Sequence, residues 1–237
     1  MTAKITVVTV VLNQADALRE TMQSVFAQSY LDLDYLVIDG GSTDGTVDVI
    51  KAKEKLLAGW LSEPDRGIYD AMNKGWGMAS SESYMLFLGA GDKLLSLPDK
   101  VEMANLTGAV VYGSVNLEGG AVFHARNGFW LKLYNSVHHQ ALLVPKKLHP
   151  EPPFNLEYPL YADFDFNQRL LKQGTSFRFS PDLQAYAAPG GLTRKLNIEE
   201  LAAVTRKNFG YCWSNFAKAG YMLSKGFPPI RRLRPIR

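Results

Sequence analysis

The sequence predicts an α/β fold, in which helices flank a mostly parallel β-sheet. First, residues 1–100 alternate between short apolar, β-branched segments and segments whose apolar residues recur at helical spacing. Second, the apolar segments are continuous, which is typical of strands buried on both faces. Third, polar residues cluster just after these segments. Because the carboxyl ends of parallel strands meet at one edge of a sheet, we expect a ligand site there.

The first half of the chain contains four expected strands, at residues 4–13, 35–38, 59–63 and 84–88. A helix is expected after each of the first three, at residues 13–29, 42–57 and 67–79. The first helix has a single apolar stripe, formed by Leu18, Met22, Val25 and Phe26. The second begins near the capping residues Ser42 and Thr43. This alternation of strand and helix predicts parallel pairing.

The second half is less regular. Strands are expected at residues 109–117, 121–126, 137–148 and 177–193. A helix is expected over residues 160–174, because Phe166, Leu170 and Leu171 share one stripe. No repeat or low-complexity linker divides the chain. We therefore expect one domain at residues 1–200 and a basic, aromatic, helical extension at residues 201–237.

The composition is that of an ordinary globular protein and argues against several other classes. Of the 237 residues, 46% are hydrophobic and 21% are charged. Cys212 is the only cysteine, so we expect no intrachain disulfide, no zinc cluster and a reducing, cytoplasmic environment. The N-terminus does not resemble a signal peptide, and no apolar run approaches the roughly 20 residues of a membrane-spanning helix.

The charge is distributed unevenly. Residues 201–237 contain eight basic residues and no acidic one, whereas residues 1–200 carry a net charge of −5. Phe209, Trp213 and Phe216 are spaced as one helical stripe in this extension. We expect it to face an anionic partner, namely the cytoplasmic surface of a membrane and not a nucleic acid. Alternatively, the stripe packs on the main domain and the arginines are solvated.

The predicted strand ends carry groups suited to a nucleotide diphosphate. Asp39 follows the second strand and could accept hydrogen bonds from a ribose or a base. Gly40 and Gly41, which have no Cβ, allow the backbone to approach a ligand closely. Asp65, in the stretch EPDRG, could accept an N–H from a uracil-like ring.

Positive charge and a metal ligand are placed at the same edge. Arg66 stands at the start of the third helix, where phosphate is favoured, and Lys74 lies further along that helix. Asp92 follows the fourth strand and is a hard oxygen ligand suited to Mg²⁺ or Mn²⁺. Each residue has a simpler explanation, because the aspartates could only shape turns and Arg66 could only pair with a neighbouring acid. Their joint placement favours a binding site.

Three stretches resemble the family 2 inverting glycosyltransferases, which have a Rossmann-like GT-A fold. They are ITVVTVVLNQADALRETMQSVFAQSY, DYLVIDGGSTDGTVDVI and SEPDRGIYDAMNKGWGMASSESYMLFLGAGD, and the resemblance extends over residues 5–193. The chain is similar in particular to bacterial enzymes that build exopolysaccharide, capsule and O-antigen repeat units. The resemblance implies a nucleotide-sugar-binding half at residues 1–100 and an acceptor-binding half at residues 101–200.

The resemblance also implies roles for individual residues. Those that would bind the donor are Thr9, Asn13 and Asp39 in the nucleoside pocket, Asp65 at the base, Arg66 at the sugar phosphate and His139 at the diphosphate or a metal. Asp163 would deprotonate the acceptor hydroxyl, and Asp165 would support it or the helix start. The implied reaction is a single displacement that moves a sugar from a nucleotide donor, expected to be a UDP-sugar, to a hydroxyl of a glycan acceptor carried on a polyprenyl diphosphate.

The sequence departs from this family at its metal motif. Relatives have two or three acids or an asparagine there, whereas this chain has Gly89-Ala90-Gly91-Asp92. A Mg²⁺ or Mn²⁺ ion could be held by Asp92, both phosphates, water and His139; alternatively, Arg66 and Lys74 neutralise the diphosphate. The reduced motif also leaves open a non-catalytic, nucleotide-sugar-binding protein of the same fold. A nicotinamide-dependent enzyme is disfavoured, because LNQADA stands where G-x-G-x-x-G would follow the first strand.

Overall fold

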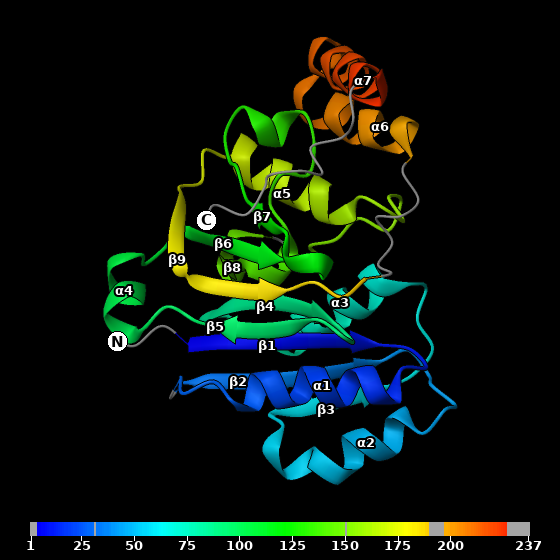
Figure 1. The fold of residues 1–237 in the computed structure, drawn as a ribbon, viewed down its shortest axis with the longest axis vertical. Helices are drawn as coiled ribbons and strands as arrows, with labels where there is room; N and C mark the ends of the chain where they lie inside the picture. The colour runs from blue at the N-terminus through cyan, green and yellow to red at the C-terminus, as the bar shows by residue number, and fades with distance from the viewer. Residues whose placement is uncertain (1–3, 31, 150, 190–196, 227–237) are drawn as a thin grey trace.

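The computed structural model describes residues 4–30, 32–149, 151–189 and 197–226, and one mixed sheet organises them (Figure 1). The strands are β1 (Lys4–Val11), β2 (Leu33–Asp39), β3 (Gly59–Ser62), β4 (Ser83–Gly89), β5 (Lys93–Ser96), β6 (Val110–Asn116), β7 (Val122–His124), β8 (Leu142–Pro145) and β9 (Phe177–Tyr186). Their order across the sheet is β3-β2-β1-β4-β8-β6-β9-β5, and β7 also pairs with β6.

Four parallel strands form the N-terminal part of the sheet. β1 lies between β2 and β4 and is parallel to both, and β3 is parallel to β2. The register aligns Val11 with Asp39, Val10 with Gly89, and Asp39 with Ser62. The carboxyl ends of these strands therefore meet at one edge, as the sequence predicts, and the loops that follow them are neighbours.

Helices cover both faces of this part of the sheet. The α-helices of the described residues are α1 (Ala15–Phe26), α2 (Thr46–Lys53), α3 (Ile68–Met78), α4 (Lys100–Asn105), α5 (Ala162–Lys172), α6 (Ile198–Phe209) and α7 (Tyr211–Gly226), and of these α1 and α2 lie on one face of β1 and α3 on the other. Successive residues of β1 face opposite ways, so Val7 belongs to the core that contains Leu18 of α1, and Val8 to the core that contains Trp76 of α3. α3 lies so close to β1 that a Cβ on Gly75 would come within 2.4 Å of a Val8 methyl group.

The predicted α/β fold is confirmed, and each antiparallel pair includes at least one strand of the second half. There β8 is antiparallel to β4 and β6, and β5 is antiparallel to β9, while β6 and β9 are parallel. The expected strand at residues 137–148 shortens to β8, because His139–Ala141 forms a 3₁₀ turn. The sequence analysis missed β5 and α4, which have only four and six residues and are too short to show a period.

α6 and α7 form a helical layer at the opposite end of the molecule from α2 (Figure 1). α6 packs on α5, and α7 packs on α6. α6 begins at Ile198, before the expected boundary, because the Asn197 side chain caps it by accepting a hydrogen bond from the Glu200 N–H at 3.1 Å. In the part of the chain that the structure describes, no helix has the length and apolar character needed to cross a membrane.

The predicted aromatic stripe is divided between these two helices. Gly210, with a φ of 88°, separates Phe209 at the end of α6 from Trp213 and Phe216 on α7. Phe209 and Trp213 lie against the main domain, where Lys132 Nζ is 5.3 Å from the first ring centroid and 4.6 Å from the second. Phe216 is 68% exposed. At two of its three positions, the stripe therefore packs on the main domain, which is the alternative interpretation given above. The four predicted membrane-facing arginines, at positions 231, 232, 234 and 237, lie outside the described residues.

Candidate active site

Asp39 organises the turn that follows β2. Its carboxylate is fully buried and accepts hydrogen bonds from the N–H groups of Gly41 at 3.2 Å and Ser42 at 3.0 Å. The hydroxyl groups of Ser42 and Ser62 donate to the same carboxylate, the latter at 2.6 Å. Four donors therefore fix this turn against the end of β3. The structure thus shows Asp39 as a turn residue, which was the simpler explanation. The contact of Asp39 with a nucleoside remains a proposal.

Thr9 has no exposed surface, and its place in the nucleoside pocket stays a prediction. It lies fully buried on the α1 side of β1, and its hydroxyl group is hydrogen-bonded to the Tyr35 hydroxyl at 2.9 Å. Asn13, in contrast, is exposed at the strand-end edge and has a left-handed backbone with a φ of 51°. Its side-chain oxygen accepts a hydrogen bond from the Thr43 N–H at 2.8 Å. Asn13 is therefore part of the same turn structure as Asp39.

The stretch EPDRG forms the loop between β3 and α3 and brings Asp65 against the Asp39 turn. Asp65 Oδ1 accepts a hydrogen bond from the Gly67 N–H at 2.8 Å, which shapes the loop. Asp65 Oδ2 lies against Gly40, where an added Cβ would come within 2.4 Å of that oxygen. The absence of a side chain at Gly40 is therefore what lets these two loops meet, and it places the carboxylates of Asp39 and Asp65 on adjoining loops.

The two predicted cations of this region have protein partners. Arg66 is 78% exposed at its side chain and pairs with Asp70 at 3.2 Å, as one simpler explanation predicted. Because the exposed Arg66 side chain is held mainly by this one acid, Arg66 can turn to another anion. Lys74 contacts Glu63 Oε1 and the Pro64 carbonyl oxygen, each at 2.9 Å. Lys74 thus braces the EPDRG loop from α3, and its part in neutralising a diphosphate stays a prediction.

Asp92 is buried and connects three segments of the chain. Its carboxylate accepts hydrogen bonds from the Gly89 N–H at 2.9 Å, the Gln140 side-chain amide at 3.2 Å and the Ala188 N–H at 2.8 Å. About one of its four lone-pair sites remains for a further partner. Within the described residues, no group of three histidine, cysteine or acidic side chains could hold a metal ion. A divalent ion at Asp92 would therefore take most of its ligands from a diphosphate and water.

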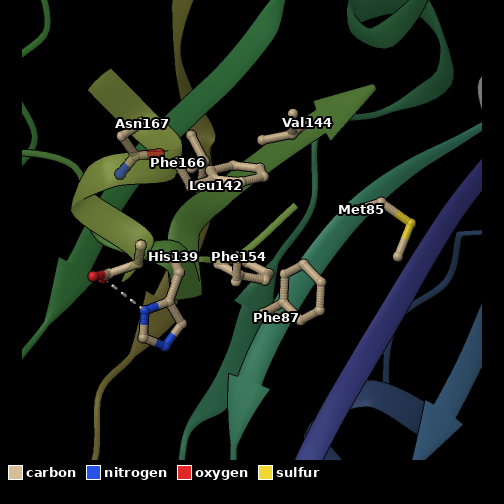
Figure 2. Close-up of a pocket in the computed structure, with 9 residues that line it drawn as sticks. Met85, Phe87, His139, Leu142, Val144, Phe154, Phe166 and Asn167 are labelled. Atoms are coloured by element: carbon tan, nitrogen blue, oxygen red, sulfur yellow. Dashed lines mark ion pairs between the residues drawn. The ribbon is translucent and has the colours of Figure 1, made fainter. Parts of the chain in front are cut away.

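Asp163 lies in the first turn of α5 and is almost fully buried. Its Oδ1 accepts hydrogen bonds from the Tyr69 hydroxyl at 2.9 Å and from the Phe164 N–H at 2.8 Å. Its Oδ2 accepts one from the Asn135 side-chain amide at 2.8 Å and forms an ion pair with His139 Nδ1 at 3.5 Å, which is the dashed line in Figure 2. Burial alone would raise the pKa of Asp163, but His139, followed by these other donors, holds it below its usual value.

The two histidines of the HHQ stretch have opposite ionisation behaviour. Burial alone would lower the pKa of His139, but its hydrogen bond and charge interaction with Asp163, together with the charge of Asp92, raise it above its usual 6.5. Burial lowers the pKa of His138 to about 4, and that ring stacks on Phe123 with centroids 4.1 Å apart. His139 is therefore the member of the pair whose protonated form is favoured, and it lies near the carboxylates of Asp163 and Asp92.

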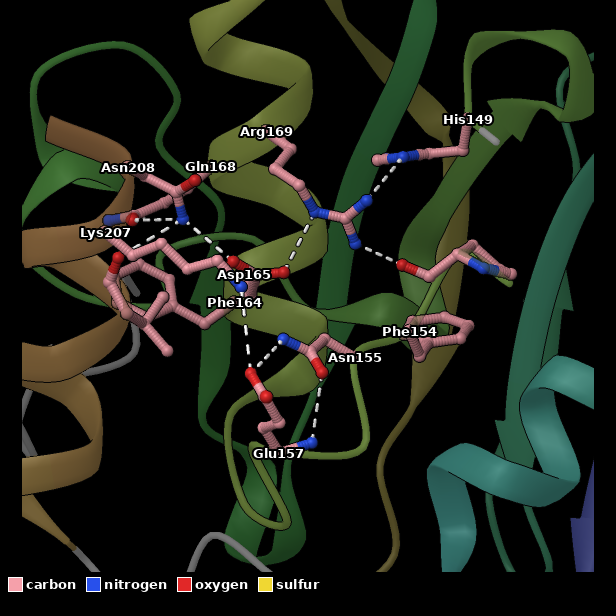
Figure 3. A network of polar contacts seen from close by, with 12 residues as sticks. His149, Phe154, Asn155, Glu157, Phe164, Asp165, Gln168, Arg169, Lys207 and Asn208 are labelled. Carbon is pink, nitrogen blue, oxygen red and sulfur yellow. Dashed lines mark hydrogen bonds and ion pairs between the residues drawn. The ribbon is translucent and has the colours of Figure 1, made fainter. Parts of the chain in front are cut away.

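Asp165 points away from this cluster. It is buried, and its carboxylate accepts hydrogen bonds from Arg169 Nε and the Asn208 side-chain amide, both at 2.9 Å (Figure 3). Because Asn208 belongs to α6, this acid anchors one helix to another. It has no contact with Asp163, whereas its place in the first turn of α5 agrees with the other expectation, that it supports the helix start.

The site contains residues that the sequence analysis did not select. Tyr69 and Asn135 hold Asp163, and Gln140 holds Asp92. Tyr69 directly follows EPDRG-Ile68, so its place in the motif was a usable signal, whereas Asn135 lies in an irregular segment without one. Figure 2 shows His139 beside the apolar side chains of Phe87 and Phe154, which line a small pocket with it. This apolar wall strengthens the charge interactions at His139.

The family model described as Glycosyl transferase family 2 matches residues 6–143. The chain belongs to this family. A "PGL/p-HBAD biosynthesis glycosyltransferase" of Mycobacterium tuberculosis is 33% identical over 172 residues, which cover 67% of this chain and 66% of that relative. This family 2 chain therefore spans slightly less than two thirds of that relative's length.

Solved structures of other proteins share the fold of this family 2 chain. S. aureus TarS, residues 1–349, in complex with UDP-GlcNAc, is similar with a TM-score of 0.66 and 15% identity over 94% of this chain and 73% of that one. The mannosyltransferase PcManGT from Pyrobaculum calidifontis, in complex with GDP-Man and Mn²⁺, is similar with a TM-score of 0.56 and 16% identity over 96% of this chain and 76% of that one. At this level of identity, the likeness confirms the GT-A fold and no more.

Proposed function

We propose that this protein is an inverting glycosyltransferase that moves a sugar from a UDP-sugar to a hydroxyl of a glycan acceptor. The observation that carries the proposal is the state of Asp163, a buried carboxylate that donors hold ionised next to His139. A carboxylate in this state can take the proton of an attacking hydroxyl group. Membership of family 2 supports the same activity.

The donor pocket is proposed at the turn after β2 and the EPDRG loop. Asp65 Oδ2 and the exposed Asn13 amide offer acceptors and donors to a uridine, and Asp39 holds the turn on which they depend. The TarS complex with UDP-GlcNAc supports a uridine donor, although the PcManGT complex contains GDP-Man on the same fold. Calorimetry with UDP and GDP tests the assignment. We expect tighter binding of UDP, and equal or reversed affinities would refute the choice of base.

The chemistry follows from the contacts of Asp163. The acceptor oxygen attacks the anomeric carbon while its proton passes to the Asp163 carboxylate, and the bond from that carbon to the β-phosphate oxygen breaks. The nucleoside diphosphate leaves with the electron pair, and one displacement inverts the configuration. Four donors already occupy Asp163, and His139 is the most distant at 3.5 Å. The acceptor hydroxyl therefore replaces His139, whose positive charge then turns to the leaving diphosphate.

Arg66, whose own side chain is exposed, supplies further positive charge to the diphosphate by leaving its partner Asp70. A Mg²⁺ or Mn²⁺ ion bound at Asp92 would act as a Lewis acid on the phosphate oxygens. The Mn²⁺ in the PcManGT structure supports such an ion, and the single carboxylate of Asp92 limits what this chain contributes to holding it. Asp92 has a second, independent task, because it fixes the segment after β9 through the Ala188 N–H.

The acceptor is proposed to be a glycan on a polyprenyl diphosphate in bacterial surface polysaccharide synthesis, with the enzyme peripheral on the cytoplasmic face of the membrane. The eight basic residues after Glu200, without one acid, support an anionic surface as partner. The alternative function is a nucleotide-sugar-binding protein without activity, which the reduced metal motif favours.

The decisive experiment is a donor screen with the purified chain across UDP-, GDP- and dTDP-sugars. Binding is followed by calorimetry, and transfer or slow hydrolysis by mass shift, with and without Mn²⁺. We expect one UDP-sugar to bind and to be turned over. A donor that binds with no turnover on any lipid-linked or free glycan acceptor would support the non-catalytic alternative.

A further inference from the structure

The exposed residues of α7 between Tyr211 and Met222 are uncharged and, apart from Asn215, have no amide or acidic group. Its exposed residues are Tyr211, Cys212, Asn215, Phe216, Ala219, Gly220 and Met222. Its buried residues include Ser214 and Ala217, which are small. A surface helix of a globular protein normally has the reverse pattern, with charged residues outward and large apolar residues inward. The exposed fractions of 72% for Tyr211, 68% for Phe216 and 64% for Met222 therefore indicate a surface that binds something.

This apolar face continues onto a second segment that is distant in the sequence. Phe129 and Trp130 are exposed on the segment that precedes α5, and the Phe129 ring packs against Trp213 of α7 with centroids 5.5 Å apart. Trp213 and Phe216 are one turn apart on α7 and are therefore neighbours. We call the exposed set Phe129, Trp130, Tyr211, Phe216 and Met222 the outer aromatic surface.

Basic side chains lie over the aromatic rings of this region. Arg126 is 5.5 Å from the ring centroid of Trp130, Lys132 is 4.6 Å from that of Trp213, and Arg206 is 5.6 Å from that of Tyr211. The nearby acid Glu199 is neutralised by Lys218 at 2.7 Å. Aromatic rings interleaved with arginine and lysine are typical of protein surfaces that sit at the boundary between lipid and water.

We propose that the outer aromatic surface docks on an anionic lipid bilayer, with its rings and Met222 among the lipid headgroups. This inference rests on the membrane partner of the proposed function, but it assigns the contact to described residues other than the C-terminal arginines. The basic side chains around the surface favour an anionic bilayer over a second copy of the chain. A second copy bound through the same surface would place each cation near its own counterpart, which is unfavourable. The sequence after Gly226 adds four more arginines and no acid, which complements an anionic bilayer further.

The position of the surface suits an acceptor that is carried in lipid. α7 packs on α6, α6 packs on α5, and α5 carries Asp163 in its first turn. The docked face thus belongs to the side of the molecule that holds the proposed base. Hydrophobic insertion and electrostatic attraction are separate contributions, so they can be separated by mutation and by salt.

The test is flotation of the full chain with vesicles of phosphatidylcholine, with and without phosphatidylglycerol, at low and high salt. The variant Phe129→Ser/Phe216→Ser removes two large exposed apolar groups. The control Leu56→Ser makes a similar change at an exposed position near the end of α2, far from α7 (Figure 1). We expect the double variant to partition into anionic vesicles roughly a hundredfold less, since each of the two buried aromatic rings contributes about a factor of ten. The control should match the wild type.

Two results would overturn the proposal. The first is equal partitioning of the wild type and the double variant, which would leave the C-terminal arginines as the sufficient contact. The second is a concentration-dependent dimer in light scattering that the double variant loses, which would identify a second copy as the occupant. The single variant Met222→Ser changes an exposed position of the same surface, so its melting temperature should equal that of the wild type. It therefore tests the surface without the risk that a folding defect explains the result. UDP binding measured on the same samples reports separately on the donor site.

Discussion

Asp163 and Asp165 stand two positions apart on α5 and have unrelated surroundings. Because successive residues of an α-helix are rotated by about 100°, these two side chains leave the helix on nearly opposite sides. Asp163 meets Tyr69, Asn135 and His139, whereas Asp165 meets Arg169 and Asn208. The helix geometry thus selects one acid for the chemistry, although the sequence presents both as candidates.

Asp163→Asn should reduce turnover by roughly 10²- to 10⁴-fold, because the amide keeps the shape of the side chain but cannot accept the acceptor proton. UDP affinity should stay close to that of the wild type, since Asp163 is not in the proposed nucleoside pocket. Both quantities are measured, by steady-state kinetics and by calorimetry. Asp182→Asn makes the same chemical change at an exposed position of β9 and serves as the control. Turnover near the wild-type level in Asp163→Asn would show that another group is the base.

The stability of the His139–Asp163 pair should depend on pH. The pKa of His139 is raised, so its contribution is complete below the unfolded value of 6.5 and is lost as the pH rises through the raised pKa. The pKa of Asp163 is lowered, so its contribution is complete above 3.8 and is lost as the pH falls through the lowered pKa. Urea unfolding of the wild type and His139→Gln should therefore differ most near pH 5, with a smaller difference near pH 9. A difference that is the same at both pH values would mean that His139 is neutral in the folded protein.

At the scale of the element, the strength of the sequence pattern decided what could be predicted. The continuous apolar runs of β1, β2 and β4 predicted a buried parallel sheet. The two glycines after β2 predicted that the backbone can approach a ligand closely there. The pattern could not distinguish an acid that binds a ligand from one that holds a turn, because both follow a strand. Asp39 and Asp92 hold turns in the structure, and the binding role of each is still to be measured. The partners of Lys74 were likewise invisible, since they depend on how a loop folds back over α3.

Gly40→Ala should weaken UDP binding with little effect on folding. The added Cβ would meet Asp65 Oδ2 at 2.4 Å and displace this carboxylate, and the change is confined to the EPDRG loop, which Asp65 shapes through the Gly67 N–H. The expected loss is about 1–3 kcal/mol in binding free energy, the usual cost of a misplaced charged hydrogen-bond partner. Calorimetry and thermal unfolding measure the two effects.

The matched control for this change is Gly77→Ala. Gly77 lies within α3, and an added Cβ there would meet nothing within 4 Å. This substitution should leave UDP affinity unchanged and stabilise the helix by roughly 0.5–1 kcal/mol. Unchanged UDP affinity in Gly40→Ala would show that Asp65 does not contact the nucleotide.

At the scale of the whole molecule, buried polar contacts join the sheet domain to the C-terminal helices. Arg169 contacts Asp165, His149 and the Pro153 carbonyl oxygen, and Asn208 of α6 completes the network at Asp165 and Gln168 (Figure 3). The Asp165 carboxylate would be an uncompensated buried charge without these donors. The helical extension expected from residue 201 onward is therefore fastened to the domain through its first helix.

Asn208→Ala should lower the free energy of unfolding by about 1–3 kcal/mol, because it removes a donor from a buried carboxylate. Asn215→Ala, at an exposed position of α7, should change it by less than about 0.5 kcal/mol. Urea titration of both variants and the wild type measures the difference. Equal stability of the two variants would mean that the network does not fasten α6 to α5.

The opposed acids of α5 have a consequence for how this protein can be re-engineered. Exchanging α6 and α7 for the corresponding helices of a relative looks like a simple terminal graft, since the segment is contiguous and ends the described chain. Yet a graft without an amide at position 208 would leave the Asp165 carboxylate short of a partner, and the strain would fall on the helix whose first turn carries Asp163. A chimera should therefore exchange position 208 together with position 165, so the segment to transplant begins inside α5.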